Sequence, residues 1–166
     1  MRRSWSLLLR LLLLALAGSL AWPASASAEI GDRWALHAGV FDTDGEQIPE
    51  LGIEYRFRPL EIKSVSLVPA VGASTTEEEN AWIYAGLRFD WEVSEHWVVT
   101  PHFAVSLYDA GEAKDLGGPV EFRSGLEVSY RFGRSSRVGI LFYHLSNADI
   151  YPDNPGTNTF ALKWGF

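Results

Sequence analysis

The sequence predicts an all-β protein, an eight-stranded antiparallel barrel that crosses a membrane with its strands. After residue 28, apolar and polar residues alternate at a period of two in eight segments, as expected for strands that separate two unlike environments. The links between these segments alternate between short and long, as in membrane barrels. No apolar stretch after residue 28 approaches the roughly 18–20 residues of a membrane helix.

The first 28 residues are predicted to be a secretory signal peptide. Arg2 and Arg3 form a basic start, residues 7–20 are an apolar run interrupted by Arg10, and residues 26–28 read Ala-Ser-Ala, an A-x-A cleavage site. We therefore expect one domain, a barrel over residues 29–166.

The mature chain is acidic and contains no cysteine. Without the three arginines of the first 28 residues, 11 of the 14 basic residues remain against 21 acidic ones, a net charge of −10. This balance argues against a nucleic-acid partner. Disulfide and thiolate chemistry are excluded because there are 0 cysteines. Stability must come from another source, such as burial in a bilayer.

The first four strands are expected at 33–41, 50–58, 62–72 and 81–93. The first three of these segments carry the alternating apolar residues Trp34, Leu36, Ala38, Val40; Leu51, Ile53, Tyr55, Phe57; and Val65, Leu67, Val71. The fourth has Ile83, Leu87, Phe89, Trp91 and Val93. The third strand is the least regular, because Pro69 cannot donate to a ladder and predicts a bulge or an early strand end.

The last four strands are expected at 97–107, 120–132, 137–146 and 158–166. The segment 120–132 is the most regular, since Val120 and Phe122 alternate with Glu121 and Arg123 and the pattern continues to Phe132. In the final segment, Phe160, Leu162, Trp164 and Phe166 stand at alternate positions. This ending resembles the C-terminal aromatic signal of proteins that the bacterial barrel-assembly machinery inserts, which makes that machinery an expected partner.

Two architectures fit the alternation: a soluble barrel or sandwich with an apolar core, or a membrane barrel with its apolar face outward. The number of bulky aromatic residues favours the membrane barrel, because tryptophan and tyrosine near strand ends suit membrane interfaces. The mature tryptophans assigned to the apolar set are Trp34, Trp82, Trp91, Trp97 and Trp164. We therefore predict a transmembrane outer-membrane β-barrel.

The link lengths orient this barrel. Short links are expected at 59–61, 94–96 and 133–136, and longer ones at 42–49, 73–80, 108–119 and 147–157. Outer-membrane barrels place short turns in the periplasm and long loops outside.

Eight strands leave an interior that side chains just fill, so we expect a closed lumen and no pore. The expected contents are Glu54, Arg56, Arg88, Glu121, Arg123, Glu127, Arg131 and Lys163, as paired charges. His37 and His102 are expected in the lumen and His96 in a periplasmic turn. No group of residues has metal-ligand spacing, so we predict no metal and no cofactor.

Polar residues interrupt the apolar face near the external end of the last hairpin. Strand alternation places His144, Ser146 and Asn158 on the face that otherwise carries apolar side chains. A polar group that faces lipid loses water without gaining a partner, so the cluster calls for a functional explanation. The structural alternative is that these residues lie in the headgroup zone and simply begin a turn.

The spacing of this cluster resembles the PagL family, the outer-membrane lipid A 3-O-deacylases, whose signature is His-x-Ser-Asn followed by Asn-x-Gly-x-Glu. Here the residues are His144, Ser146 and Asn147, then Asn154, Gly156 and, at the Glu position, Asn158. The resemblance implies a triad of Ser146, His144 and Asn158 in the outer leaflet. It also implies oxyanion or substrate contacts from Asn147, Asn154 and Gly156. Asp149 and Asp153 are alternative sources of the missing acid.

The function implied by the resemblance is removal of the 3-O-linked acyl chain from lipid A of lipopolysaccharide, in the outer membrane of a Gram-negative bacterium. Two alternatives remain open from the residues alone. One is a non-catalytic structural or adhesion barrel, and the other is a phospholipase-like outer-membrane hydrolase. The sequence also leaves open whether the chain forms a homodimer.

Overall fold

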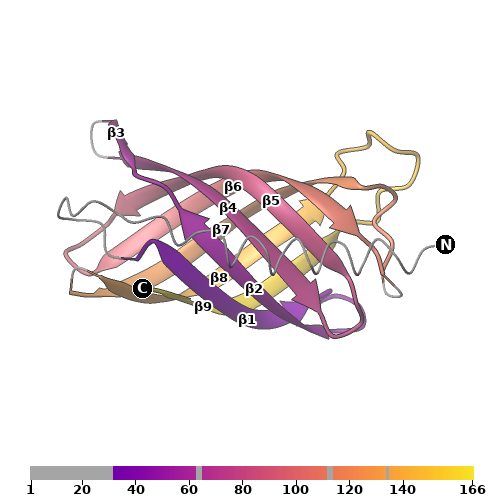
Figure 1. The fold of residues 1–166 in the computed structure, drawn as a ribbon, viewed down its shortest axis with the longest axis horizontal. Helices are drawn as coiled ribbons and strands as arrows, with labels where there is room; N and C mark the ends of the chain where they lie inside the picture. Colours follow the sequence, from indigo (N-terminus) through magenta and orange to yellow (C-terminus); the bar gives the residue numbers. More distant parts are fainter. Residues whose placement is uncertain (1–31, 63–64, 112–113, 134) are drawn as a thin grey trace, which may run out of the picture.

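The protein is an antiparallel β-barrel, seen here in a computed structural model that describes residues 32–62, 65–111, 114–133 and 135–166 (Figure 1). The predicted signal peptide, residues 1–28, lies outside the described residues. The strands are β1 Trp34–Phe41, β2 Ile48–Arg56, β3 Leu60–Ile62, β4 Val65–Thr76, β5 Ala81–Glu92, β6 Trp97–Asp109, β7 Val120–Phe132, β8 Ser136–Ser146 and β9 Thr157–Gly165. No helix among these residues is long and apolar enough to cross a membrane.

The sheet closes on itself, as the all-β prediction requires. From β3 to β9 each strand pairs with the next one along the chain, β1 pairs with both β2 and β9, and β2 pairs with β4 and not with β3. The short β3 pairs with β4 as well, so β2 and β3 together form one interrupted barrel strand and the barrel has eight. The described start of β1 meets the C-terminus through Trp34 N–H to Phe166 O at 3.0 Å.

The prediction was wrong about where the second and third strands end. Residues 60 and 61 form strand and not turn, and residue 62 ends β3 instead of beginning the third predicted strand. β4 starts at Val65 and passes through Pro69 to Thr76. Pro69 lies beside the interruption at 57–59, and its carbonyl accepts from Phe57 N at 2.9 Å. Because the N and C=O of one residue face the same antiparallel neighbour, the missing proline donor faces the gap.

Four loops gather at one end of the barrel, which we call the external end (Figure 1). The two longest, 110–119 and 147–156, match the predicted links 108–119 and 147–157 to within two residues. The other two, 42–47 and 77–80, are shorter than expected because β2 begins earlier and β4 ends later than the polarity pattern indicated.

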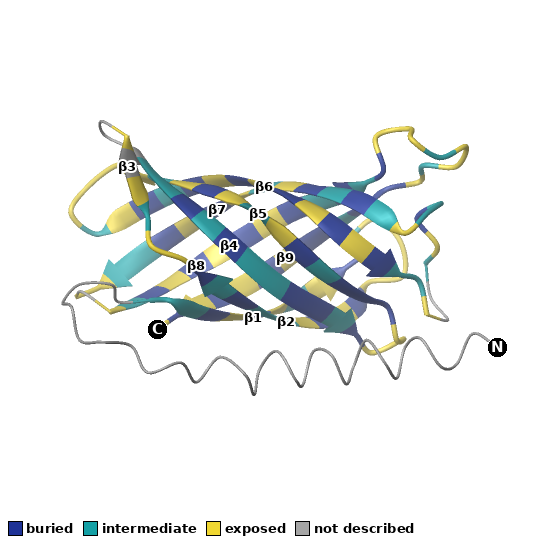
Figure 2. Ribbon diagram, turned by 45° about the horizontal axis from the view of Figure 1, so that its top comes forward, coloured by how far each residue is buried: buried dark blue, intermediate teal, exposed yellow. Residues whose placement is uncertain are grey.

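The two faces of the barrel have opposite chemistry. Exposed and buried residues alternate along the strands (Figure 2). Outward side chains are apolar and exposed, from Val40 at 37% to Leu51 at 64%, whereas inward charged residues such as Glu54 are about 1% exposed. This arrangement is that of a membrane barrel and excludes the soluble alternative, in which the apolar set would lie inside. Trp82 is an exception to the prediction, because it is fully buried in the interior.

Trp82 belongs to an apolar cluster that closes the external end of the lumen. Its ring lies 5.4 Å from that of Phe41 and 5.9 Å from that of Tyr108, measured between centroids. Leu116 from loop 110–119 is buried in the same cluster. The lumen is therefore filled at this end.

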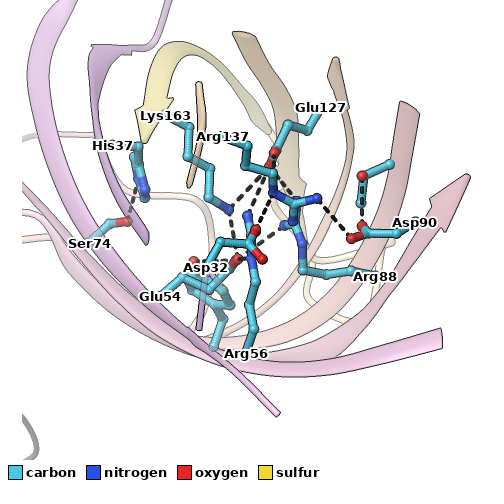
Figure 3. Close-up of polar contacts among 12 residues, drawn as sticks. Asp32, His37, Glu54, Arg56, Ser74, Arg88, Asp90, Glu127, Arg137 and Lys163 are labelled. Atoms are coloured by element: carbon cyan, nitrogen blue, oxygen red, sulfur yellow. Dashed lines mark hydrogen bonds and ion pairs between the residues drawn. The ribbon is translucent and has the colours of Figure 1, made fainter. Parts of the chain in front are cut away.

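Below this cluster the lumen holds a network of buried charges centred on Glu54 and Glu127 (Figure 3). Lys163 Nζ lies 2.7 Å from Glu54 Oε1 and 3.3 Å from Glu127 Oε2. Arg88 contacts both carboxylates, and so does Arg56. Because these residues come from β2, β5, β7 and β9, the network ties opposite walls of the barrel together.

Three predicted members differ from the expectation. The Arg123 guanidinium forms no ion pair with a described residue and lies over the rings of Tyr84 and Tyr143, at 4.5 and 3.9 Å from their centroids. Arg131 lies at the rim, where its guanidinium pairs with Glu92 at 2.5 Å, and Arg137 takes part in the inner network in its place. Glu121 is buried, but its carboxylate makes no hydrogen bond to another described residue.

We predict that Glu127→Gln lowers the free energy of unfolding by about 3–5 kcal/mol, because removing one partner leaves buried cations uncompensated. Urea unfolding in lipid vesicles measures this change. Glu92→Gln is the matched control, since the Glu92 side chain is 62% exposed. Its change should stay below about 1 kcal/mol. Equal effects of the two variants would contradict a structural role for the inner network.

Candidate active site

His144 and Ser146 lie at the external end of β8 and project from the outer face. Their neighbours Tyr143 and Leu145 are fully buried in the lumen. His144 and Ser146 are half-buried, on the same side as the exposed Phe142. Since alternate residues of a strand share a face, the imidazole and the hydroxyl both point outward.

Asn158 is the cross-strand partner of His144 on β9. The two side chains meet through His144 Nδ1 and Asn158 Oδ1 at 2.9 Å. A carbonyl oxygen can only accept, so Nδ1 carries a hydrogen, and in the neutral ring Nε2 then presents its lone pair. The residue that replaces the expected acid therefore contacts the histidine as a triad member would.

Gly156 shows where the reactive edge of the ring points. A methyl group added at Gly156 would lie 2.9 Å from His144 Cε1 and 3.1 Å from Nε2. Leu145 pairs with Thr157, and continuing this register by one residue sets Gly156 beside Ser146. The Nε2 edge thus points toward the level of Ser146. The two side chains make no hydrogen bond to each other in this structure, and such contacts often tighten only with substrate bound.

A second hydroxyl, which the sequence interpretation did not consider, flanks the histidine. Ser124 on β7 is the other cross-strand partner of His144 and is exposed on the same outer face. Ser124 lies level with the His144 ring and not with its Nε2 edge. This favours Ser146 as the hydroxyl that faces Nε2.

The structure gives Asn147 a different place from the one predicted. Its side chain is buried, and Nδ2 donates to Leu116 O at 2.9 Å and to Asp153 O at 2.8 Å. Its backbone N–H donates to Asn154 Oδ1 at 3.0 Å. These donors are occupied, so Asn147 anchors loop 147–156 to loop 110–119 and does not offer them to an oxyanion.

Asn154 lies next to the residue that follows Ser146. Its oxygen accepts from Asn147 N, and one hydrogen of its Nδ2 goes to Asp149 Oδ1 at 2.9 Å. Neither Asp149 nor Asp153 makes a hydrogen bond to His144, so the two alternative acids suggested by the sequence do not contact the ring.

An acidic residue that the sequence interpretation missed contacts the site instead. Asp44 lies in loop 42–47, and its Oδ2 accepts from Asn158 Nδ2 at 2.5 Å. Strand parity says nothing about a loop residue. Asp44 could have been found only from the predicted closure of the barrel, because closure places the first external loop beside the start of the last strand.

Asp42 holds this loop in place. Its carboxylate accepts from Lys114 Nζ at 2.5 Å, from Thr157 Oγ1 at 3.1 Å and from Glu46 N at 3.2 Å. Burial alone would raise the pKa of Asp42, but these hydrogen bonds outweigh it and hold the pKa below its usual value. Asp42 therefore stays ionised at neutral pH and anchors the loop to β9.

Among the residues that the structure describes, no group of three or more His, Asp or Glu side chains is placed to hold a metal ion.

Comparison with known proteins assigns the chain to a family. The model of the lipid A 3-O-deacylase (PagL) family matches residues 17–166. The chain belongs to the PagL family. The crystal structure of the outer membrane enzyme PagL is similar in fold, with a TM-score of 0.69 at 14% identity over 80% of this chain and 97% of that one. This protein is accordingly an outer-membrane barrel of a family of lipid A ester hydrolases.

The outer membrane protein Ail of Yersinia pestis is a weaker match, with a TM-score of 0.48 at 9% identity over 81% of this chain and 99% of that one. A comparison with curated protein sequences finds no match.

Gly156 lies so close to His144 that a larger residue at this position should disturb the ring in this member of the PagL family. Gly156 has φ of 60°, so Gly156→Ala strains the backbone and also pushes on the ring. Gly133→Ala is a matched control, because Gly133 has φ of 66° and nothing within 4 Å of an added Cβ. Both variants should lose about 1–3 kcal/mol of stability from the left-handed conformation.

Only Gly156→Ala should displace the imidazole and lower lipid A deacylation. Histidine NMR signals and product mass spectrometry measure the two effects. Equal activity in both variants would argue against a ring held by this contact.

Proposed function

We propose that this protein removes the 3-O-linked acyl chain from lipid A by serine ester hydrolysis, with Ser146 as nucleophile and His144 as general base. The observation that carries the proposal is the orientation of His144. Its Nδ1 is engaged by Asn158 Oδ1, and its Nε2 edge is turned toward the level of Ser146. This is the arrangement that a hydrolytic triad requires.

In the proposed reaction, Ser146 Oγ attacks the acyl carbonyl while His144 Nε2 takes its proton. The tetrahedral intermediate collapses by breaking the ester C–O bond, and His144 returns the proton to the 3-hydroxyl of the departing lipid A. Water then attacks the acyl-enzyme with His144 again as base. The products are the free fatty acid and lipid A lacking one chain.

The oxyanion needs at least one donor near Ser146. Asn154 is the proposed source, because its amide lies against the backbone of Asn147, next to Ser146, and only one of its Nδ2 hydrogens is bonded to Asp149. Preorganised donors of this kind each contribute about 10²–10³ in rate.

The proposed substrate follows from the family and from the depth of the site. His144 and Ser146 lie at the external end of the apolar outer face, where they meet the outer leaflet. In an outer membrane that leaflet contains lipid A, whose ester carbonyls lie between headgroup and hydrocarbon.

We predict that Ser146→Ala abolishes deacylation, with a loss of about 10⁶ in turnover, as is typical when a hydrolase loses its nucleophile. Mass spectrometry of lipid A from expressing cells measures the loss of one hydroxyacyl chain. Ser124→Ala is the matched control, because it removes a hydroxyl from the same face beside His144. It should retain activity.

Other results would reject the proposal. Loss of activity in Ser124→Ala with full activity in Ser146→Ala would assign the nucleophile to the other hydroxyl. Cleavage of glycerophospholipids with lipid A untouched would instead support a phospholipase. Intact lipid A from cells with folded wild-type barrel would support a non-catalytic protein.

A further inference from the structure

We infer that Asp44 is a positioning residue that locks the Asn158 amide in the orientation His144 needs to act as a base. The inference rests on the proposed function of His144, and it names a residue outside the family motif. It explains how a chain with asparagine in the place of the triad acid can keep a working histidine.

An asparagine at this position creates a problem that a carboxylate does not. A carboxylate only accepts, so it always selects the ring tautomer with hydrogen on Nδ1. An amide can also turn its NH₂ toward the ring, which then keeps its hydrogen on Nε2 and cannot take a proton from serine. In serine hydrolases, replacing the acid by asparagine costs about 10⁴ in rate through this wrong tautomer.

Asp44 removes the ambiguity. A carboxylate has no hydrogen to donate, so the atom of Asn158 that faces Asp44 Oδ2 at 2.5 Å must be Nδ2. The opposite atom, Oδ1, then faces His144 Nδ1 at 2.9 Å. The chain Asp44, Asn158, His144 therefore has one hydrogen-bond direction, and it ends with a free lone pair on Nε2.

The same contact returns negative charge to the triad. Hydrogen bonds to ionised groups are stronger than neutral ones, and bonds in a chain polarise one another. The negative charge of Asp44 polarises the Asn158 amide. This increases the electron density on Oδ1 and makes Oδ1 a better acceptor. This stabilises the imidazolium that forms when Ser146 loses its proton.

The fold holds Asp44 firmly enough for this role, although the side chain is exposed. Thr43 N donates to Asn158 O at 3.1 Å, which extends the β1–β9 pairing to the residue before Asp44. Asp42 is bonded to Lys114 and Thr157, and Gly45 N donates to Asp42 O at 2.9 Å. The residues on either side of Asp44 are thus fixed to the barrel.

The test is steady-state deacylation of vesicles containing lipid A by the purified, reconstituted protein. Asp44→Asn keeps the size of the side chain but can donate or accept, so both amides can flip together. We expect kcat to fall at least about 10-fold, with KM changed less than about 2-fold, because an oriented base acts in the transition state and not in binding. Glu46→Gln, an equal charge change at an exposed position in the same loop, should match the wild type.

A second variant separates positioning from mere loop support. In an Asn158→Glu background the carboxylate accepts from His144 directly, so Asp44→Asn should no longer lower kcat. If Asp44 only supported the loop, its replacement would lower kcat in both backgrounds. That result would overturn the inference, and so would an Asp44→Asn variant with wild-type kcat.

A readout independent of activity distinguishes failure of the inference from failure of the proposed function. With ¹⁵N-labelled histidine at a pH where the ring is neutral, wild-type His144 should carry its hydrogen on Nδ1. Asp44→Asn should add the form protonated on Nε2. An inactive wild type would reject the proposed function alone, whereas an unchanged tautomer in Asp44→Asn would reject the inference.

Discussion

The buried charge network around Glu54 and Glu127 is the interaction on which the rest of the structure depends. It fills the lumen with groups that would be costly to expose to lipid, so the sheet is stable only with ions inward and apolar side chains outward. A strand has only two faces. Once the network fixes which one is inside, the outward position of His144 and Ser146 follows from their parity on β8.

Barrel closure provides the next constraint. Residues 44 and 158 are 114 apart in the sequence, yet their side chains touch because β1 pairs with β9. The pairing ends at the level where loop 42–47 begins, and Asp42 joins that loop to β9 and to loop 110–119. The site is thus assembled from the seam of the barrel, where its first and last strands meet.

The sequence was sufficient for whatever depends on periodicity. The strand alternation predicted the barrel, its inside-out polarity and the outward position of His144, Ser146 and Asn158. It misplaced Trp82 because a tryptophan near a strand end suits either the membrane interface or the apolar cluster that closes the external end of the lumen. It missed β3 because residues 59–61 fell in a short link between two alternating segments, whereas in the barrel β4 pairs with residues 60–62.

Loop contacts were beyond the reach of these patterns for a different reason. The buried position of Asn147 depends on Leu116 and Asp153, and the role inferred for Asp44 depends on the exact register of β1 against β9. Neither has a periodic signature. A motif transfers residue types along one stretch of chain, whereas these contacts join stretches that only the closed barrel brings together.

The inferred division of the acid's role between Asn158 and Asp44 would have a physical advantage at this location. Asn158 is half-buried on the face that lies against hydrocarbon, where an ionised carboxylate would lose much of its hydration. An amide is neutral there and still accepts from the imidazole. Asp44 is exposed in the loop, where water stabilises a negative charge, and the Asn158 amide is the one group between it and the ring. The carboxylate of Asp44 thus stays in water, while the Asn158 amide that it orients lies on the lipid face beside His144.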